Sequence, residues 1–124
     1  MSRARWHILR EQAALTLTRA VPARFDIGAE TVLPMADPLR LAHQIRQDMW
    51  RALQKLRGFS PVVRLEARDG GLLVRAGGRV AAPVPPAAVA RIAEVLESPA
   101  NRQRWLRHAG RRAATFDKPG GNAP

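Results

Sequence analysis

The chain has 124 residues, of which 46% are hydrophobic, and it carries a formal net charge of +11. This length predicts one domain with a real core, and the apolar content excludes wholesale disorder. The absence of cysteine excludes disulfides, a thiol nucleophile and cysteine-ligated zinc. No apolar run approaches the roughly 18 residues that a membrane span needs. We therefore expect a protein without a membrane span, in a reducing compartment such as the cytoplasm.

Positive charge is the strongest feature of the composition. The chain has 21 Lys and Arg residues against 10 Asp and Glu, and only Lys55 and Lys118 are lysines. The preference for Arg, together with abundant Ala, is typical of a high-GC bacterial genome. That codon bias does not account for the excess of basic over acidic residues. The excess indicates a polyanionic partner: a nucleic acid, an acidic protein surface or an anionic membrane surface.

The first third of the chain predicts two short strands after an ambiguous start. Residues 1–14 form an arm that is either extended or a short helix. Residues 15–18 alternate apolar and polar side chains, and the β-branched Thr residues favour a strand there. Residues 25–32 alternate in the same way, so we expect a second strand that ends near Val32.

The stretch from Asp37 to Arg57 predicts the longest helix. Asp37 is a favoured N-cap, Pro38 suits the first helical position, and Gly58 follows as a left-handed C-terminal cap. Apolar residues recur at three- and four-residue steps and form one face, which we expect to pack on a sheet. That face consists of Leu41, Ala42, Ile45, Met49, Ala52, Leu53 and Leu56.

Two alternating runs around an Asp-Gly-Gly turn at residues 69–71 predict a β-hairpin over residues 62–76. Asp-Gly is a strong two-residue turn because both positions tolerate a positive φ. If the Asp-Gly pair forms the loop, Arg64 faces Arg75, and if the Gly-Gly pair forms it, Glu66 faces Arg75. Both registers keep the same apolar side chains on the inner face.

Two helices are predicted near the C-terminus, one that begins at Pro85-Pro86 and one that runs from about Pro99 to Gly110 or a little beyond. A Pro-Pro pair opens the first and a Ser-Pro pair opens the second. Residues 80–84 precede them as a short edge strand, and residues 115–124 are predicted to be a disordered tail. The sequence as a whole predicts a single basic α+β domain over residues 1–114. In it the long helix packs on a small antiparallel sheet and the two C-terminal helices close one side.

No catalytic, cofactor or metal motif is found in the sequence. His7, His43 and His108 are scattered, without a paired acid at ligand spacing, so no metal site is expected. The Gly pairs at residues 70–71 and 77–78 are interpreted as turns, because neither belongs to a phosphate-loop pattern before a helix. We therefore expect a non-enzymatic protein without a cofactor.

Two binding functions are expected, with nucleic acid ahead of a protein partner. In the first, arginines of the last helix and of the hairpin contact phosphates with little sequence preference. In the second, arginines pair with acidic patches on a protein, and the chain acts as an adaptor or assembly subunit with Trp50 and Trp105 as anchors. A merely solvated basic face is the plain alternative to both. The candidate polyanion-binding residues are Arg102, Arg104, Arg107, His108, Arg111, Arg112, Arg64, Arg68 and Arg75.

Overall fold

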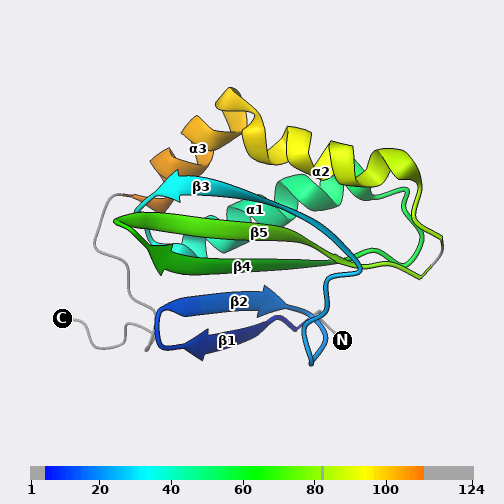
Figure 1. Cartoon of the computed structure of the whole chain (residues 1–124), viewed down its shortest axis with the longest axis horizontal. Coiled ribbons are helices and arrows are strands. Elements are labelled where there is room, and N and C mark those ends of the chain that lie inside the picture. The colour runs from blue at the N-terminus through cyan, green and yellow to red at the C-terminus, as the bar shows by residue number, and fades with distance from the viewer. Residues whose placement is uncertain (1–4, 82, 111–124) are drawn as a thin grey trace.

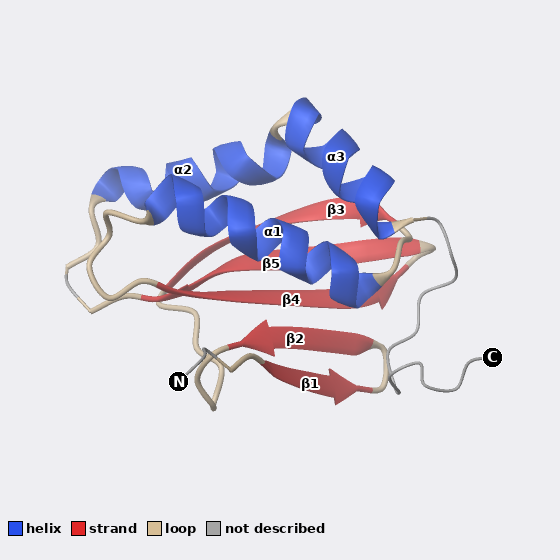
Figure 2. Ribbon diagram, turned by 180° about the vertical axis from the view of Figure 1, so that it is seen from behind, coloured by secondary structure: helices blue, strands red, loops and turns tan. Residues whose placement is uncertain are grey.

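The computed structural model describes residues 5–81 and 83–110, which form an antiparallel sheet covered on one face by helices (Figures 1 and 2). The α+β class predicted from the sequence is confirmed. The predicted tail at residues 115–124 lies outside the described residues. In chain order the elements are β1 (His7–Glu11), β2 (Ala14–Thr18), β3 (Ile27–Pro34), α1 (Pro38–Leu53), β4 (Ser60–Arg68), β5 (Gly71–Arg79), α2 (Pro86–Glu97) and α3 (Pro99–Ala109).

The strands are ordered β1-β2-β4-β5-β3, and each pairs antiparallel with its neighbours. The hairpin of β4 and β5 occupies the centre, with the β1–β2 hairpin on one side and β3 on the other (Figure 2). α1 connects β3 at one edge to β4 in the middle and packs against β2, β4 and β5. α2 packs on β3, and α3 packs on α1 and α2. All three helices thus lie on the same face of the sheet (Figure 1).

The central hairpin adopts the first of the two predicted registers. Asp69 and Gly70 both have positive φ, at 49° and 81°, so these two residues form the loop. The loop places Arg64 opposite Arg75. The side chains that alternate with these arginines are buried, so the predicted inner face is confirmed.

α1 begins where the sequence predicts and ends earlier. The Asp37 carboxylate accepts a hydrogen bond from the backbone N–H of Arg40 at 2.9 Å, and Pro38 takes the first helical position. The helix stops at Leu53 rather than Arg57, because the N–H of Leu56 bonds to the Leu53 carbonyl and tightens the chain into turns. Of the predicted apolar face, Leu41, Ala42, Ile45, Met49 and Leu53 are buried, and Ala52 is partly buried.

The N-terminal arm is a strand, not a helix. β1 pairs along its whole length with β2, and the two are joined by a two-residue turn at Gln12 and Ala13. Neither residue is typical of a hairpin turn, so the sequence carries no local signal for this hairpin. β1 therefore forms because it pairs with β2 and not because of a turn signal.

β5 runs through Gly77 and Gly78 to Arg79, where the sequence predicts a turn. A Cβ on Gly77 would lie 2.0 Å from the carbonyl oxygen of Ile27, so glycine is required by the close approach of β3. The edge strand predicted over residues 80–84 is wrong for the described part of that stretch, which is loop. There the N–H of Val80 donates to the Asp26 carboxylate at 2.9 Å instead of to a strand.

One apolar core lies between the sheet and the helices. α1 contributes the predicted face up to Leu53, while Ala52 and Leu56 are only partly buried. In the described residues no helix combines the length and apolar character required to cross a bilayer. The largest fully buried side chains include Leu15, Leu17, Leu41, Ile45, Met49, Leu65, Ile92, Leu96 and Trp105.

Candidate functional site

Arg102, the first of the candidate polyanion-binding residues on α3, instead stabilises the fold. Arg102 donates hydrogen bonds to the Thr31 hydroxyl at 2.9 Å and to the carbonyls of Leu96 and Val32 at 3.0 and 2.7 Å. Its guanidinium lies 3.7 Å from the Glu97 carboxylate. These contacts tie α3 to the edge strand β3, and they engage donors that a phosphate would otherwise use.

Arg104 and Trp105 are also engaged within the molecule. Arg104 forms an ion pair with Asp48 on α1 and donates to the Asn101 side chain at 3.1 Å. Trp105 is fully buried, and its indole N–H donates to the same Asp48 at 2.6 Å. No part of this indole is open to a partner, in contrast to the expected anchor role. Of the other α3 candidates, Arg107 and His108 are exposed, and those at 111 and 112 lie outside the described residues.

The three arginines of the central hairpin lie on the sheet face opposite the helices, because they alternate with core residues. Arg64 donates to the Glu11 carboxylate at 2.8 Å, and Arg68 lies 3.3 Å from its neighbour Glu66. Arg75 stands over the ring of Phe25, 4.4 Å from its centroid. The two groups of expected polyanion-binding residues therefore lie on opposite sides of the sheet and do not form one patch.

A different set of cations converges beside the β1–β2 hairpin. A hollow of about 260 Å³ is lined by five residues, which we call the Trp–Arg pocket: Trp6, Arg19, Arg46, Trp50 and Pro61. Trp6 and Arg19 flank the last paired residues of β1 and β2, while Arg46 and Trp50 lie one turn apart on α1. The pocket is thus assembled by the packing of α1 on the N-terminal hairpin.

Trp6 holds the two arginines of this pocket together. The guanidinium carbons of Arg46 and Arg19 lie 4.7 and 5.6 Å from the centre of its ring, at cation–π distances. His43 contacts the indole edge-on, with centroids 6.5 Å apart. Trp6 is therefore largely occupied, whereas Trp50 keeps 46% of its surface exposed.

In the part of the chain that the structure describes, the guanidinium groups of Arg19 and Arg46 lack acidic partners. Within residues 5–81 and 83–110, neither Arg19 nor Arg46 forms an ion pair with a carboxylate, and no acid lines the pocket. Burial lowers the pKa of Arg46, and the nearby charge of Arg19 lowers it further. Arg46 also donates to Nδ1 of His43 at 3.3 Å, and burial together with the charge of Arg46 lowers the pKa of that imidazole. The site thus holds two uncompensated positive charges close together.

Such an arrangement favours an anion, because an anion would offset the repulsion between the two arginines. The exposed indole of Trp50 adds a flat apolar surface beside them. From the sequence, Trp50 was predicted as an anchor, and Arg46, Trp6 and Arg19 were missed. The signal for Trp6 and Arg19 was the β1–β2 pairing, which puts them at the same end of a hairpin, and that hairpin was not predicted.

Comparison with protein-family models, with curated proteins and with solved structures finds no match to this chain. In the part of the chain that the structure describes, no three His, Asp or Glu side chains gather as possible metal ligands. The case for a function therefore rests on the chemistry of the Trp–Arg pocket.

Proposed function

We propose that this chain is a non-enzymatic module that binds single-stranded nucleic acid, with the Trp–Arg pocket as the contact point for one base and its phosphate. The observation that carries the proposal is the pair Arg19 and Arg46, which converge without a carboxylate beside the exposed indole of Trp50. Single-stranded nucleic acid combines the two chemistries that such a site recognises, a phosphate and a flat aromatic base.

Each residue of the pocket has a separate role in this proposal. The guanidinium groups of Arg19 and Arg46 bind a phosphate through charge-assisted hydrogen bonds, which remain available while the groups stand over a ring. Trp6 positions them, and Trp50 stacks on the base. Because the arginines are already held in place, less side-chain entropy is lost on binding than for two free arginines.

The pocket favours a single strand over a duplex. The faces of duplex bases are stacked on one another and are not available to an indole at the protein surface. The remaining positive charge, including the exposed Arg75 and Arg107, adds long-range attraction that weakens with salt. The expected affinity is therefore salt-dependent and only weakly dependent on sequence.

Titration of the intrinsic tryptophan fluorescence with an oligothymidylate tests this function. Stacking on Trp50 is expected to quench the emission at low salt, whereas an abasic strand of the same length and charge is expected to bind more weakly and to quench less. Trp50→Ala should lose about 1–3 kcal/mol of binding free energy, the usual contribution of one stacked base.

Val32→Ala provides the control for that variant, because Val32 is an exposed apolar residue on β3, away from the pocket. It should bind like the unmodified protein. Equal affinity for the thymidine and abasic strands would contradict the proposal, since it would leave only general attraction to polyanions.

A protein-interaction adaptor is the second candidate function, and the exposure of Trp50 is the observation in its favour. A half-exposed indole flanked by arginines is typical of an anchor in a protein interface. Nuclease digestion separates the two functions. Complexes that persist after digestion, and that Trp50→Ala dissociates, would favour the adaptor.

A further inference from the structure

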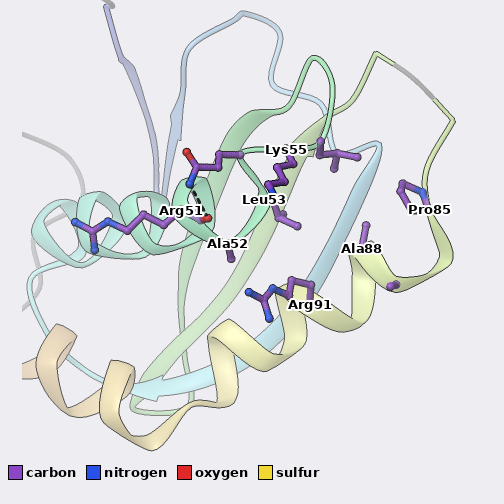
Figure 3. A pocket seen from close by; sticks show the side chains of 10 residues that line it. Arg51, Ala52, Leu53, Lys55, Pro85, Ala88 and Arg91 are labelled. Carbon is purple, nitrogen blue, oxygen red and sulfur yellow. Dashed lines mark hydrogen bonds between the residues drawn. The ribbon is translucent and has the colours of Figure 1, made fainter.

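A second hollow lies on the other side of α1, between its C-terminal end and the start of α2 (Figure 3). Its volume is about 460 Å³, within the range of ligand-binding clefts. We call it the α1–α2 groove, and it shares no residue with the Trp–Arg pocket. The residues that line it are Arg51, Ala52, Leu53, Gln54, Lys55, Leu56, Pro85, Ala87, Ala88 and Arg91.

The floor of the groove is aliphatic. Leu53 and Ala88 are buried members of the core, and Leu56 is a partly buried one. Val84 and Val89 flank the start of α2 and keep 40% and 42% of their surfaces exposed. An open hollow with an aliphatic floor is typical of a site that another apolar group covers.

The rim of the groove is positively charged, and its lining contains no acid. Figure 3 shows Lys55 on the α1 side and Arg91 on the α2 side, whereas the side chain of Arg51 extends along α1 away from Pro85. Arg91 has a weak partner one turn along its own helix, Glu94 at 3.3 Å, and in the described residues Lys55 has no ion-pair partner. Both cations are exposed, so an incoming carboxylate can pair with Lys55 directly and can compete with Glu94 for Arg91.

We propose that the α1–α2 groove binds an acidic segment of a partner protein that carries aliphatic side chains. Those side chains occupy the floor at Leu53, Leu56 and Ala88, and the flanking carboxylates pair with Lys55 and Arg91. The charge complementarity is what selects this occupant, because apolar side chains alone have no preference for a cationic rim. The groove has no aromatic residue, so it offers a base no stacking surface. This inference does not depend on the nucleic-acid proposal.

Isothermal titration calorimetry with two synthetic peptides tests the inference. One peptide combines Glu with Leu and Val, and the other has the same Glu residues with Ser in place of every aliphatic residue. The first should bind at least about ten-fold more tightly, equivalent to about 1.4 kcal/mol. Equal binding of the two peptides would overturn the inference, because it would show that the aliphatic floor is not used.

Two variants locate the binding. Lys55→Glu reverses a rim charge, and Ala87→Trp fills the groove from an exposed position of α2, so neither change disturbs the core. Each variant should weaken the binding of the peptide that contains Glu, Leu and Val at least about ten-fold. Arg40→Glu, an equal reversal at an exposed position near the start of α1, should have little effect, and so should Arg19→Gln in the Trp–Arg pocket.

Two outcomes of this comparison would contradict the assignment. Equal weakening by Lys55→Glu and Arg40→Glu would mean that only net charge matters. The second outcome is that an oligonucleotide displaces the peptide and that Lys55→Glu weakens the binding of this oligonucleotide. That result would assign the groove to polyanions. If Arg19→Gln loses oligonucleotide binding but keeps peptide binding, the peptide binds independently of the Trp–Arg pocket. The groove proposal and the pocket proposal are thus tested separately.

Discussion

Asp48 on α1 accepts a hydrogen bond from the indole Nε1 of Trp105 on α3, at 2.6 Å. The same carboxylate pairs with Arg104 and with Arg51, and only 12% of the Asp48 side chain is exposed. One acidic residue thus joins the largest buried side chain of the core to a cation of the C-terminal helix. This contact explains why the positive charge of α3 is only partly available to a ligand.

Asp48→Ala is expected to destabilise the fold by about 2–3 kcal/mol, because it leaves the indole N–H and the Arg104 guanidinium without their acceptor. Urea unfolding measures the change. Arg51→Ala serves as the control and should cost less than about 1 kcal/mol, since the Arg51 side chain is 70% exposed. Similar values for the two variants would show that Asp48 does not hold α3 in place.

Gly77→Ala tests the close approach of β3 to β5. The new Cβ would lie 2.0 Å from the Ile27 carbonyl oxygen, and a backbone atom cannot rotate away, so we expect a loss of about 3 kcal/mol or more. Gly28→Ala, in the register partner on β3, is the matched control. Its Cβ would lie 3.2 Å from the nearest atom, the Ala76 carbonyl oxygen, and the loss should be clearly smaller. Equal losses in urea unfolding would contradict the β3–β5 packing.

Features with a local cause were predictable from the sequence. The α1 N-cap follows from Asp37 and Pro38, and the central hairpin follows from the positive-φ turn at Asp69 and Gly70. Strand β1 lacks such a cause, since its turn has no characteristic residue and its partner β2 supplies the pairing. The sequence predicts a turn at Gly77. The structure shows instead that Gly77 is a strand residue, where glycine is needed because the backbone of β3 approaches closely.

The candidate site was harder to predict than the fold, because it depends on contacts between residues that are far apart in the sequence. Charge and residue type were visible in the sequence, but the partners of each cation were not. Arg102 and Arg104 find acceptors on β3 and α1, far away in sequence. Arg19 and Arg46 meet over Trp6 only after the hairpin and α1 have packed.

Acid should destabilise the protein partly through Asp26. Hydrogen bonds from Arg24 and from the backbone N–H of Val80 lower the pKa of Asp26 from 3.8 to about 2. A carboxylate with a depressed pKa stabilises the fold fully above its unfolded value, and this contribution is lost as the pH falls from about 4 through about 2. Urea unfolding across this range should show a shallower decline in Asp26→Asn than in the unmodified protein. Parallel curves would rule out a contribution from Asp26.

His43 should report on occupation of the Trp–Arg pocket. Burial and the charge of Arg46 lower its pKa, so in the free protein the imidazole resists protonation. An anion bound to Arg46 and Arg19 would offset that charge and raise the His43 pKa, so affinity should increase as the pH falls below about 6.5. NMR titration should show the His43 midpoint rise when an oligonucleotide is bound. An unchanged His43 midpoint would place the anion elsewhere.

The most direct measurement compares two double variants that lose the same charge. Arg19→Gln/Arg46→Gln removes the two cations of the Trp–Arg pocket, and Arg40→Gln/Arg107→Gln removes two exposed cations outside it. Oligothymidylate affinity at low salt should fall at least about ten-fold further in the first than in the second. Equal losses in the two would show that binding follows net charge alone and would contradict a localised site.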